Sequence, residues 1–161
     1  MEIVDRIKGS LIGGAIGDAL GYPVEFMKVE SIKNKSWIFD LKELNERRTP
    51  GNTCLSALSN SEMGTIEKPI NKSKGCGGVM RVAPVGLYFK PSDYMTLDRV
   101  GQISAKISAI THGHPLGIIP AYVLAALIND ITYNENFTLE EHVENAMKCF
   151  RKNWHEKNVS A

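Results

Sequence analysis

The sequence lacks the cysteine spacing that marks disulfide frameworks and zinc clusters. Its three cysteines, Cys54, Cys76 and Cys149, lie far apart and form no C-x-x-C pair. Neither a disulfide scaffold nor a structural zinc site is therefore supported. Dispersed cysteines in an odd number fit a reducing compartment, and we expect a cytoplasmic protein.

The sequence also lacks an excess of charge of either sign. Its 161 residues carry 19 Lys and Arg against 18 Asp and Glu, a formal net charge of +1. Because the basic residues do not collect into one run, we expect no nucleic-acid partner and no anionic membrane surface. The apolar run Leu11–Ile16 is too short to span a membrane, and charged residues flank it. We therefore expect no membrane partner.

Strand patterns are missing as well, because no stretch shows sustained alternation of apolar and polar residues. Apolar residues recur instead at helical spacing, which predicts helices over residues 2–20, 96–111, 118–131 and 138–153. The polar stretch from Trp154 onward is expected to fray. With 43% hydrophobic residues, the chain has enough apolar material for one core. The prediction is an all-α protein with a single domain over residues 1–161.

Capping residues indicate where several of these helices begin. Thr96 is a candidate N-cap, and Thr138 with Glu141 forms the pattern of a capping box. A short helix over residues 54–60 is expected to be capped by Thr53 or by Asn52. The core face of the last helix is expected to contain Val143, Met147 and Phe150.

Residues 73–84, SKGCGGVMRVAP, contain three glycines within four positions and then an apolar segment that carries one arginine. Gly75, Gly77 and Gly78 can adopt positive φ at little cost and let backbone N–H groups approach a ligand closely. If a helix begins near Val79, its unpaired N–H groups favour phosphate or carboxylate at the same point. The stretch matches neither the Walker motif nor the dinucleotide fingerprint, so a simple connecting loop is the alternative.

Glu25 and His112 are the other candidate site residues. Glu25 follows a glycine-rich helix end and Pro23, where its carboxylate could be a general base, a metal ligand or merely solvated. His112 lies in the turn THGHP between two apolar helices. A surface turn with satisfied histidines is the alternative for that segment.

Four motifs, in this order, resemble the ADP-ribosylglycohydrolase family, which includes the dinitrogenase-reductase-activating glycohydrolases and the J-type crystallins. The motifs are GSLIGGAIGDALGYPVEF, RRTPGNTCLSAL, NKSKGCGGVMRVAPVGL and ITHGHPLG. The resemblance implies an all-α fold that hydrolyses the N- or O-glycosidic bond of ADP-ribose on a modified side chain. It also implies two magnesium or manganese ions, with ADP-ribose or an ADP-ribosylated protein as the partner.

The resemblance also implies roles for particular residues. Glu25 matches the family glutamate near the scissile ribose, His112 matches a histidine that contacts the ribose region, and Asp18 matches an aspartate that holds the GDA turn. The diphosphate cradle would be formed by Ser73, Gly75, Cys76, Gly77, Gly78, Val79 and Met80.

The chain departs from the family pattern at both metal motifs. The family's Thr-Asp-Asp run is missing, since the ten residues between Phe26 and Trp37 contain no aspartate. The family's later Asp-x-Asp-Thr motif is also missing. A metal site needs several oxygen ligands at once, so we assign no metal ligand and expect the ions not to bind properly.

These departures indicate a family member that has lost an internal block, with a seam near Ser31–Ser36, and also its C-terminal part. Hydrolysis is then expected to be impaired or lost, and some helices should expose apolar faces whose neighbours are gone. The alternatives are a non-catalytic binder of ADP-ribose or nucleotides, and a crystallin-like structural fragment.

Overall fold

The computed structural model describes residues 2–21, 28, 30 and 51–158. Its regular elements are all helices, and these ranges contain no strand, so the all-α prediction is confirmed. The chain divides into two compact units, Met1–Thr49 and Pro50–Ala161, each of which is described by itself. A single domain over residues 1–161 and the seam near Ser31–Ser36 stay predictions, and the seam lies outside the described residues.

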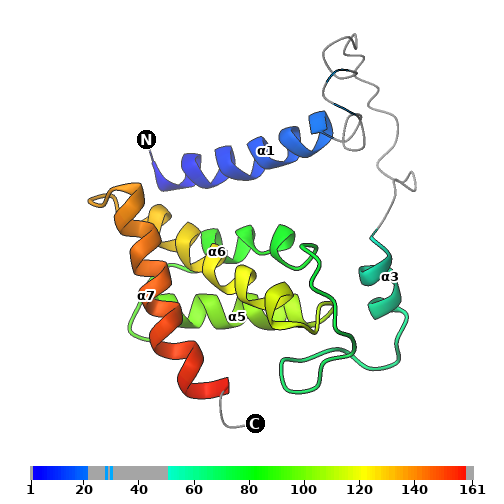
Figure 1. The fold of residues 1–161 in the computed structure, drawn as a ribbon. Coiled ribbons are helices and arrows are strands. Elements are labelled where there is room, and N and C mark those ends of the chain that lie inside the picture. The colour runs from blue at the N-terminus through cyan, green and yellow to red at the C-terminus, as the bar shows by residue number, and fades with distance from the viewer. Residues whose placement is uncertain (1, 22–27, 29, 31–50, 159–161) are drawn as a thin grey trace. The chain divides into compact units, whose positions relative to one another are not determined.

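The described part of the first unit is the helix α1, Ile3–Gly21 (Figure 1). It confirms the helix predicted over residues 2–20. The carbonyl of Glu2 accepts hydrogen bonds from the N–H groups of Asp5 and Arg6, at 3.0 and 3.2 Å. The acidic side chain of Asp5 in the first turn complements the positive end of the helix dipole.

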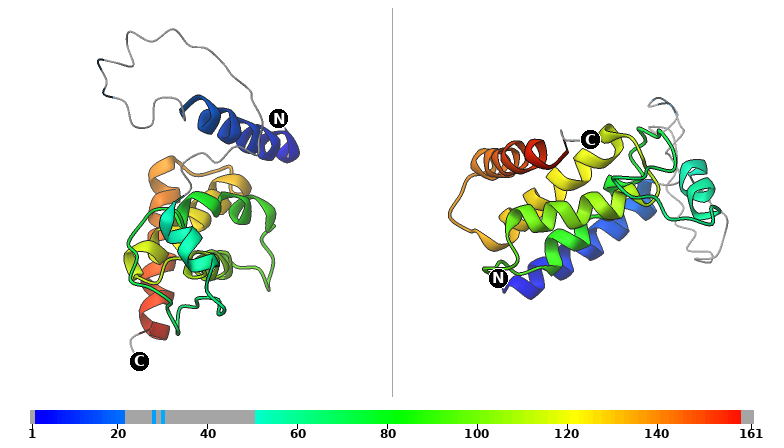
Figure 2. Two further views of the ribbon diagram at one scale, coloured as in Figure 1. Left: turned by 90° about the vertical axis from the view of Figure 1, so that its right-hand side faces the viewer. Right: turned by 90° about the horizontal axis from the view of Figure 1, so that it is seen from below.

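In the second unit, most of the helices pack around one long central helix. In chain order the elements are α3 (Asn52–Leu58), the 3₁₀ helix η2 (Val79–Arg81), α4 (Ala83–Tyr88), α5 (Leu97–Ala109), α6 (Pro115–Tyr133) and α7 (Leu139–Asn158). The helices α4, α5 and α7 all contact α6 (Figures 1 and 2). The connection between α5 and α6 is short, and it carries the predicted THGHP turn.

The core of the second unit is built from small side chains along α6. Ala121 and Ala125 are fully buried against Val82 and Val100. Gly86 of α4 lies so close that an added Cβ would be 2.7 Å from the carbonyl oxygen of Ala125. Small residues therefore let α4 and α5 approach the central helix closely, as close packing of helices requires.

An aromatic cluster joins α6 to α7. The buried ring of Tyr122 makes edge-to-face contacts with Phe150 and Trp154, with centroids 5.5 and 5.8 Å apart. Such pairs contribute about 0.5–1.5 kcal/mol beyond the area they bury. The Tyr122 hydroxyl donates to Asp98 at 2.6 Å, and burial raises the pKa of this hydroxyl well above its ordinary value. Because Trp154 packs in this cluster and α7 continues to Asn158, the expectation of a frayed tail from Trp154 is wrong.

The predicted caps of α5 and α7 are confirmed. Thr96 Oγ1 accepts from the Arg99 N–H at 3.3 Å. In the capping box of α7, the Glu141 carboxylate accepts from the Thr138 N–H at 2.7 Å, and Thr138 Oγ1 accepts from the Glu141 N–H at 3.3 Å.

Two other sequence expectations need correction. The helix α3 begins at Asn52 with Gly51 as its N-cap and no side-chain cap bond, so neither Asn52 nor Thr53 is the cap. In α7 the inward positions include His142 and Ala146, while Val143 is 42% exposed. Of the predicted core face, Phe150 does pack inward against Tyr122, whereas Val143 does not, because a buried polar pair turns His142 inward at the start of this helix.

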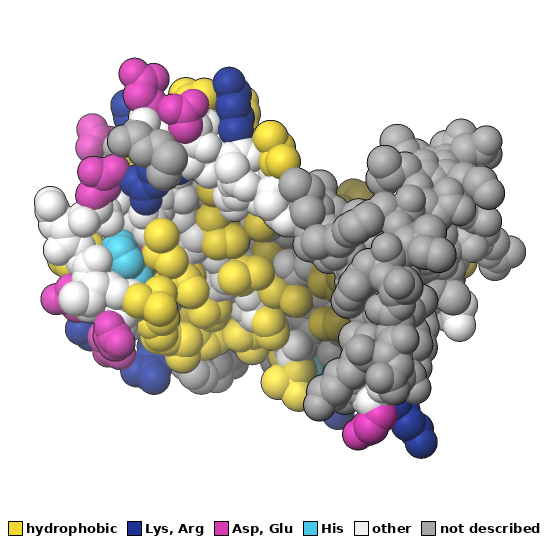
Figure 3. Space-filling model, turned by 90° about the horizontal axis from the view of Figure 1, so that it is seen from above, with side chains coloured by type: hydrophobic (Ala, Val, Ile, Leu, Met, Phe, Trp, Pro, Cys, Tyr) yellow, Lys and Arg dark blue, Asp and Glu magenta, His cyan; other side chains and the backbone are white. Residues whose placement is uncertain are grey.

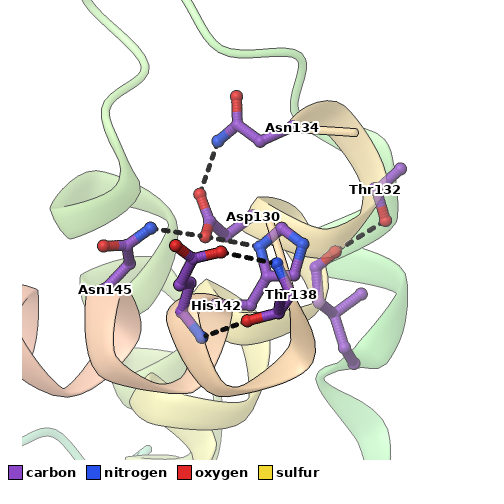
Figure 4. A network of polar contacts seen from close by, with 8 residues as sticks. Asp130, Thr132, Asn134, Thr138, His142 and Asn145 are labelled. Atoms are coloured by element: carbon purple, nitrogen blue, oxygen red, sulfur yellow. Dashed lines mark hydrogen bonds and ion pairs between the residues drawn. The ribbon is translucent and has the colours of Figure 1, made fainter. Parts of the chain in front are cut away.

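That polar pair consists of Asp130 at the end of α6 and His142 in the first turns of α7 (Figure 4). His142 Nδ1 lies 2.8 Å from Asp130 Oδ2, and both side chains are buried. Asn145 Nδ2 donates to the same carboxylate oxygen at 3.2 Å, and Asn134 Nδ2 donates to the other oxygen. Buried polar groups need such partners, so the network fixes how α7 leaves the α6 end.

Within the described ranges, α6 is the one helix long and apolar enough to cross a membrane by length and composition. It is also the helix around which α4, α5 and α7 pack. Its buried polar side chains, Asn129 and Asp130, bond to other parts of the protein. The apolar character of α6 is thus accounted for by its central position.

Candidate ligand-binding site

His112 lies in the turn between α5 and α6 and is only 2% exposed. Its backbone N–H donates to the carbonyl of Ser108 at 3.0 Å, which extends the bonding pattern of α5 by one turn. Burial, and then the nearby positive charge of Arg81, lower the pKa of His112 from its ordinary value of 6.5. The imidazole is therefore neutral at pH 7.

Arg81 holds the C-terminal end of α5 from the side of the glycine turn. Its Nη2 donates to the carbonyl of Ile107 at 2.9 Å and also lies 3.3 Å from the carbonyl of Ser108. The same nitrogen donates to Thr111 Oγ1 at 2.6 Å. A cation is favourable at a helix C-terminus, where carbonyl groups have no partner within the helix.

The glycines of the predicted turn face the His112 ring. A Cβ added to Gly75 would lie 3.3 Å from His112 Nε2, and one added to Gly77 would lie 3.0 Å from His112 Cε1. None of Gly75, Gly77 and Gly78 has φ in the left-handed region. The expectation that these glycines supply positive φ is therefore wrong. At Gly75 and Gly77 the backbone passes close to the imidazole, and an added Cβ would be in tight contact with the ring, so that the ring or the turn would have to shift by a few tenths of an ångström.

Gly78 shows the closest approach of the three. A Cβ at Gly78 would lie 1.8 Å from Ser108 Oγ and 3.2 Å from the carbonyl oxygen of Gly117. Ser108 Oγ itself donates to the Gly117 carbonyl at 2.8 Å. The glycine turn, α5 and the first turns of α6 are thus locked together around one buried hydroxyl.

Asn71 ties the start of the turn to the connection that carries His112. Its Oδ1 accepts from the N–H groups of Ser73 and Gly113, at 2.9 and 3.0 Å, and its Nδ2 donates to the carbonyl of Thr111 at 2.9 Å. The Ser73 carbonyl in turn accepts from the N–H of His114 at 3.3 Å. Sequence reasoning missed Asn71, because no motif or spacing distinguishes this contact across some forty positions.

Some backbone N–H groups at the turn have a hydrogen-bond partner and others have none. The N–H groups of Val79 and Met80 both bond to the carbonyl of Cys76, at 3.1 and 3.3 Å. Within the described residues, the N–H groups of the three preceding positions, Cys76–Gly78, have no hydrogen-bond partner. These three donors begin a helical turn, as the unpaired groups at a helix start do. They are the anion donors that the turn can offer.

The helix expected near Val79 differs from the prediction. It is a three-residue 3₁₀ helix, and α4 follows only after a break at Val82. Val79 packs against the core, whereas Met80 is exposed. Because their N–H groups already bond to the Cys76 carbonyl, Val79 and Met80 add no free backbone donor to the predicted cradle.

The helix α3 borders the other side of the turn. Cys54 Sγ would lie 3.3 Å from a Cβ at Gly77, and Thr53 Oγ1 is 3.5 Å from Ser73 Oγ. His112 Nε2 lies within 3.3 Å of the same Gly77 position. The fold thus brings the motif around Thr53 and the motif around Ser73 together at His112. The sequence alone did not predict that these two motifs are neighbours.

Glu25, the predicted catalytic residue, and the neighbouring Phe26 lie outside the described residues. Among the residues that are described, no group of three or more His, Cys, Asp or Glu side chains could hold a metal ion. The described side chains therefore do not fit a magnesium or manganese centre, which needs several oxygen ligands.

The helices and the site define an all-α protein in which a glycine turn encloses a buried neutral histidine beside unpaired backbone donors. The family model for ADP-ribosylglycohydrolase matches the chain over residues 1–47 and 34–160. The chain belongs to the ADP-ribosylglycohydrolase family. Neither a curated protein nor a solved structure gave a match.

Proposed function

We propose that the chain binds ADP-ribose, free or attached to a protein side chain, at the glycine turn beside His112, with little or no hydrolysis. The observation that carries this proposal is the run of unpaired N–H groups at Cys76–Gly78 next to the imidazole of His112. Successive backbone donors at the start of a helical turn suit the oxygens of a diphosphate. Membership of the ADP-ribosylglycohydrolase family supports an ADP-ribosyl ligand over other anions.

Hydrolysis in this family generally depends on metal ions, which would activate water and stabilise charge. Because the described residues do not fit such a centre, no step is assigned to a metal in this chain. Glu25 remains the proposed catalytic residue, as a carboxylate that acts on water or on the substrate. Without metal ligands, this carboxylate alone is expected to give weak turnover at most.

The two-part match to the family model supports a break in the chain relative to the family pattern. One segment covers residues 1–47 and the other covers residues 34–160. A chain that lacks an internal block aligns with the two sides of that block separately. We place the seam near Ser31–Ser36, where the Thr-Asp-Asp run of the family would be expected.

Titration calorimetry with ADP-ribose tests the binding proposal. The unmodified chain should give saturable heat, and Gly77→Val should abolish it, because the added side chain would crowd His112 and Cys54. Gly51→Val is the matched control, since nothing lies within 4 Å of a Cβ at that glycine. Thermal melts of both variants show whether they are folded. Absence of heat with the unmodified chain, or full binding by folded Gly77→Val, would refute the proposal.

A hydrolysis assay tests the catalytic half. The purified chain is incubated with an ADP-ribosylated arginine or serine peptide, with and without magnesium or manganese, and released ADP-ribose is measured. We expect no metal-dependent release. Robust release that Glu25→Gln abolishes would show instead that the chain is an active glycohydrolase.

A further inference from the structure

The hydrogen bonds around Thr111 determine which ring nitrogen of His112 carries the proton. Thr111 is 1% exposed, and its hydroxyl has one proton to donate and two lone pairs. Arg81 Nη2, which can only donate, uses one lone pair at 2.6 Å. Nδ1 of His112 lies 2.8 Å from the same oxygen. No other partner of this hydroxyl exists among the described residues.

If His112 carried its proton on Nδ1, the Thr111 hydroxyl would accept two hydrogen bonds and its own proton would have no acceptor. A buried unpaired donor is costly, by about 1–3 kcal/mol. If Nδ1 is unprotonated, the Thr111 hydroxyl donates to it and every atom of the set is satisfied. The neutral ring then carries its proton on Nε2.

Nε2 faces the space that the glycines leave open. It lies 3.3 Å from the Cβ positions of both Gly75 and Gly77. Nε2 has no hydrogen-bond partner within the described ranges. The one fully buried side-chain nitrogen or oxygen without a partner in these ranges is Ser104 Oγ, so Nε2 itself is not fully buried. Nε2 therefore retains access to the surface of the turn, next to the unpaired N–H groups of Cys76–Gly78.

We propose that Arg81 and Thr111 are positioning residues that fix His112 as the Nε2–H tautomer, so that the ring offers an N–H donor to an oxygen atom of the bound ligand. This inference rests on the proposed function for the identity of that ligand. The recognised group is an acceptor, such as a phosphate or ribose oxygen. The ring adds a side-chain donor to the backbone donors, and it is not available as a general base through Nε2.

Arg81 serves this arrangement in two ways. It is anchored on the carbonyls of Ile107 and Ser108, so its contact with Thr111 is fixed in direction. Its positive charge also opposes protonation of His112, and this keeps the ring neutral. An arginine in an otherwise apolar segment is thereby accounted for by the ring that it orients.

The experiment is long-range ¹H–¹⁵N NMR of the full chain labelled with ¹⁵N-histidine, near pH 7, because the two neutral tautomers give different nitrogen shifts. The unmodified chain should show His112 as the Nε2–H form. Thr111→Ser keeps the hydroxyl and should keep that form, whereas Thr111→Val should give a mixture of tautomers. Thr132→Val is the matched control, since this buried threonine donates to the Ile128 carbonyl elsewhere on α6.

ADP-ribose affinity is then measured on the same proteins. Thr111→Val should bind between about three-fold and ten-fold more weakly, the range expected for one hydrogen bond. Thr111→Ser and Thr132→Val should bind as the unmodified chain does. An Nδ1–H or protonated His112 in the unmodified chain would overturn the inference, whether or not the variants fold. An unchanged tautomer in Thr111→Val would overturn it as well.

The two proposals can fail separately. If His112 is the Nε2–H form and Thr111→Val disturbs it, but ADP-ribose does not bind, the proposed function fails while the positioning roles hold. If ADP-ribose binds but the tautomer is wrong, only the positioning roles fail.

Discussion

Contact distance requires a glycine at position 78 of the site, beside Ser108. The φ of Gly78, −69°, is ordinary, yet an added Cβ would lie 1.8 Å from Ser108 Oγ and 2.9 Å from Ser108 Cβ. The conformational freedom of glycine, which the sequence suggested as the reason, is not used here. The sequence indicated that this glycine matters to the turn, but it did not show that the reason is the close contact with Ser108.

Gly78→Ala should destabilise the second unit by about 1–3 kcal/mol through overpacking. Ser108→Ala alone should cost about 0.5–1.5 kcal/mol, since it removes the bond to the Gly117 carbonyl. The double variant should cost less than the sum, because Ser108→Ala removes the hydroxyl that the methyl group added by Gly78→Ala would strike. Chemical denaturation of the four proteins measures this cycle. Strict additivity would show that Gly78 and Ser108 are not in contact.

The lowered pKa of His112 predicts how stability changes with pH. The unfolded chain binds a proton on this ring more readily than the folded chain, so folding opposes protonation. The neutral ring contributes fully to the free energy of unfolding above the unfolded pKa of about 6.5, and this contribution is lost progressively as the pH falls below that value. The free energy of unfolding should therefore drop less between about pH 7.5 and about pH 5.5 in His112→Gln than in the unmodified chain. Equal drops in both proteins would contradict a lowered pKa.

Side-chain contacts over long sequence separations could not be predicted. Asn71 and Thr111 join segments that only the fold brings together, and neither belongs to a pattern with known chemistry. His112 was predicted as a site residue, but its burial was not, since a turn between helices is normally exposed. The lone Arg81 was visible in the sequence without a role.

At the scale of elements, periodicity located the long helices and the predicted caps of α5 and α7 were correct, whereas the predicted cap of α3 was wrong. Thr96 and the pair Thr138 and Glu141 act locally, so their roles could be predicted from spacing alone. On α7, Phe150 was predicted correctly as an inward residue but Val143 was not, because His142 is a polar residue that turns inward. The burial of His142 depends on Asp130, which lies on α6, and no motif or periodicity in the sequence links the two residues.

The contact between Asp130 and His142 should be among the stronger links between α6 and α7. Asp130→Ala should cost about 1–3 kcal/mol or more, because it leaves His142 Nδ1 and the amides of Asn134 and Asn145 without their acceptor. Lys148→Ala is the control, since it breaks only an exposed pair with Glu144 on α7 and should cost at most about 1 kcal/mol. Denaturant unfolding of both variants gives the comparison. Equal effects would show that the buried network contributes no more than a surface pair.

At the scale of the whole molecule, the expected loss of an internal block predicts exposed apolar side chains that lack their neighbours. Figure 3 shows hydrophobic side chains, in yellow, over part of the described surface in that view. In the second unit the exposed large hydrophobic residues are Leu55, Leu58, Met63, Met80, Tyr88, Tyr94, Leu116, Phe137, Leu139 and Val143. Single exposed apolar residues are common, but gathered ones indicate surfaces that normally have a neighbour.

A hydrophobic fluorescent dye should therefore bind the native chain without denaturant. Replacing Leu139 and Val143 of α7 by glutamine should reduce the fluorescence, since both side chains are exposed. Replacing the exposed Glu144 by glutamine should leave it unchanged. Lack of dye binding by the folded chain would contradict the loss of neighbouring segments.

The central claim is that ADP-ribose binds at the glycine turn beside His112, and amide NMR of the ¹⁵N-labelled chain during titration with ADP-ribose tests it most directly. The account predicts saturable shifts at the amides of Cys76, Gly77, Gly78 and His112, whose unpaired or adjacent groups form the site. The amides of α7 should stay unchanged. No saturable shift at the turn, or shifts confined to another part of the chain, would contradict the account.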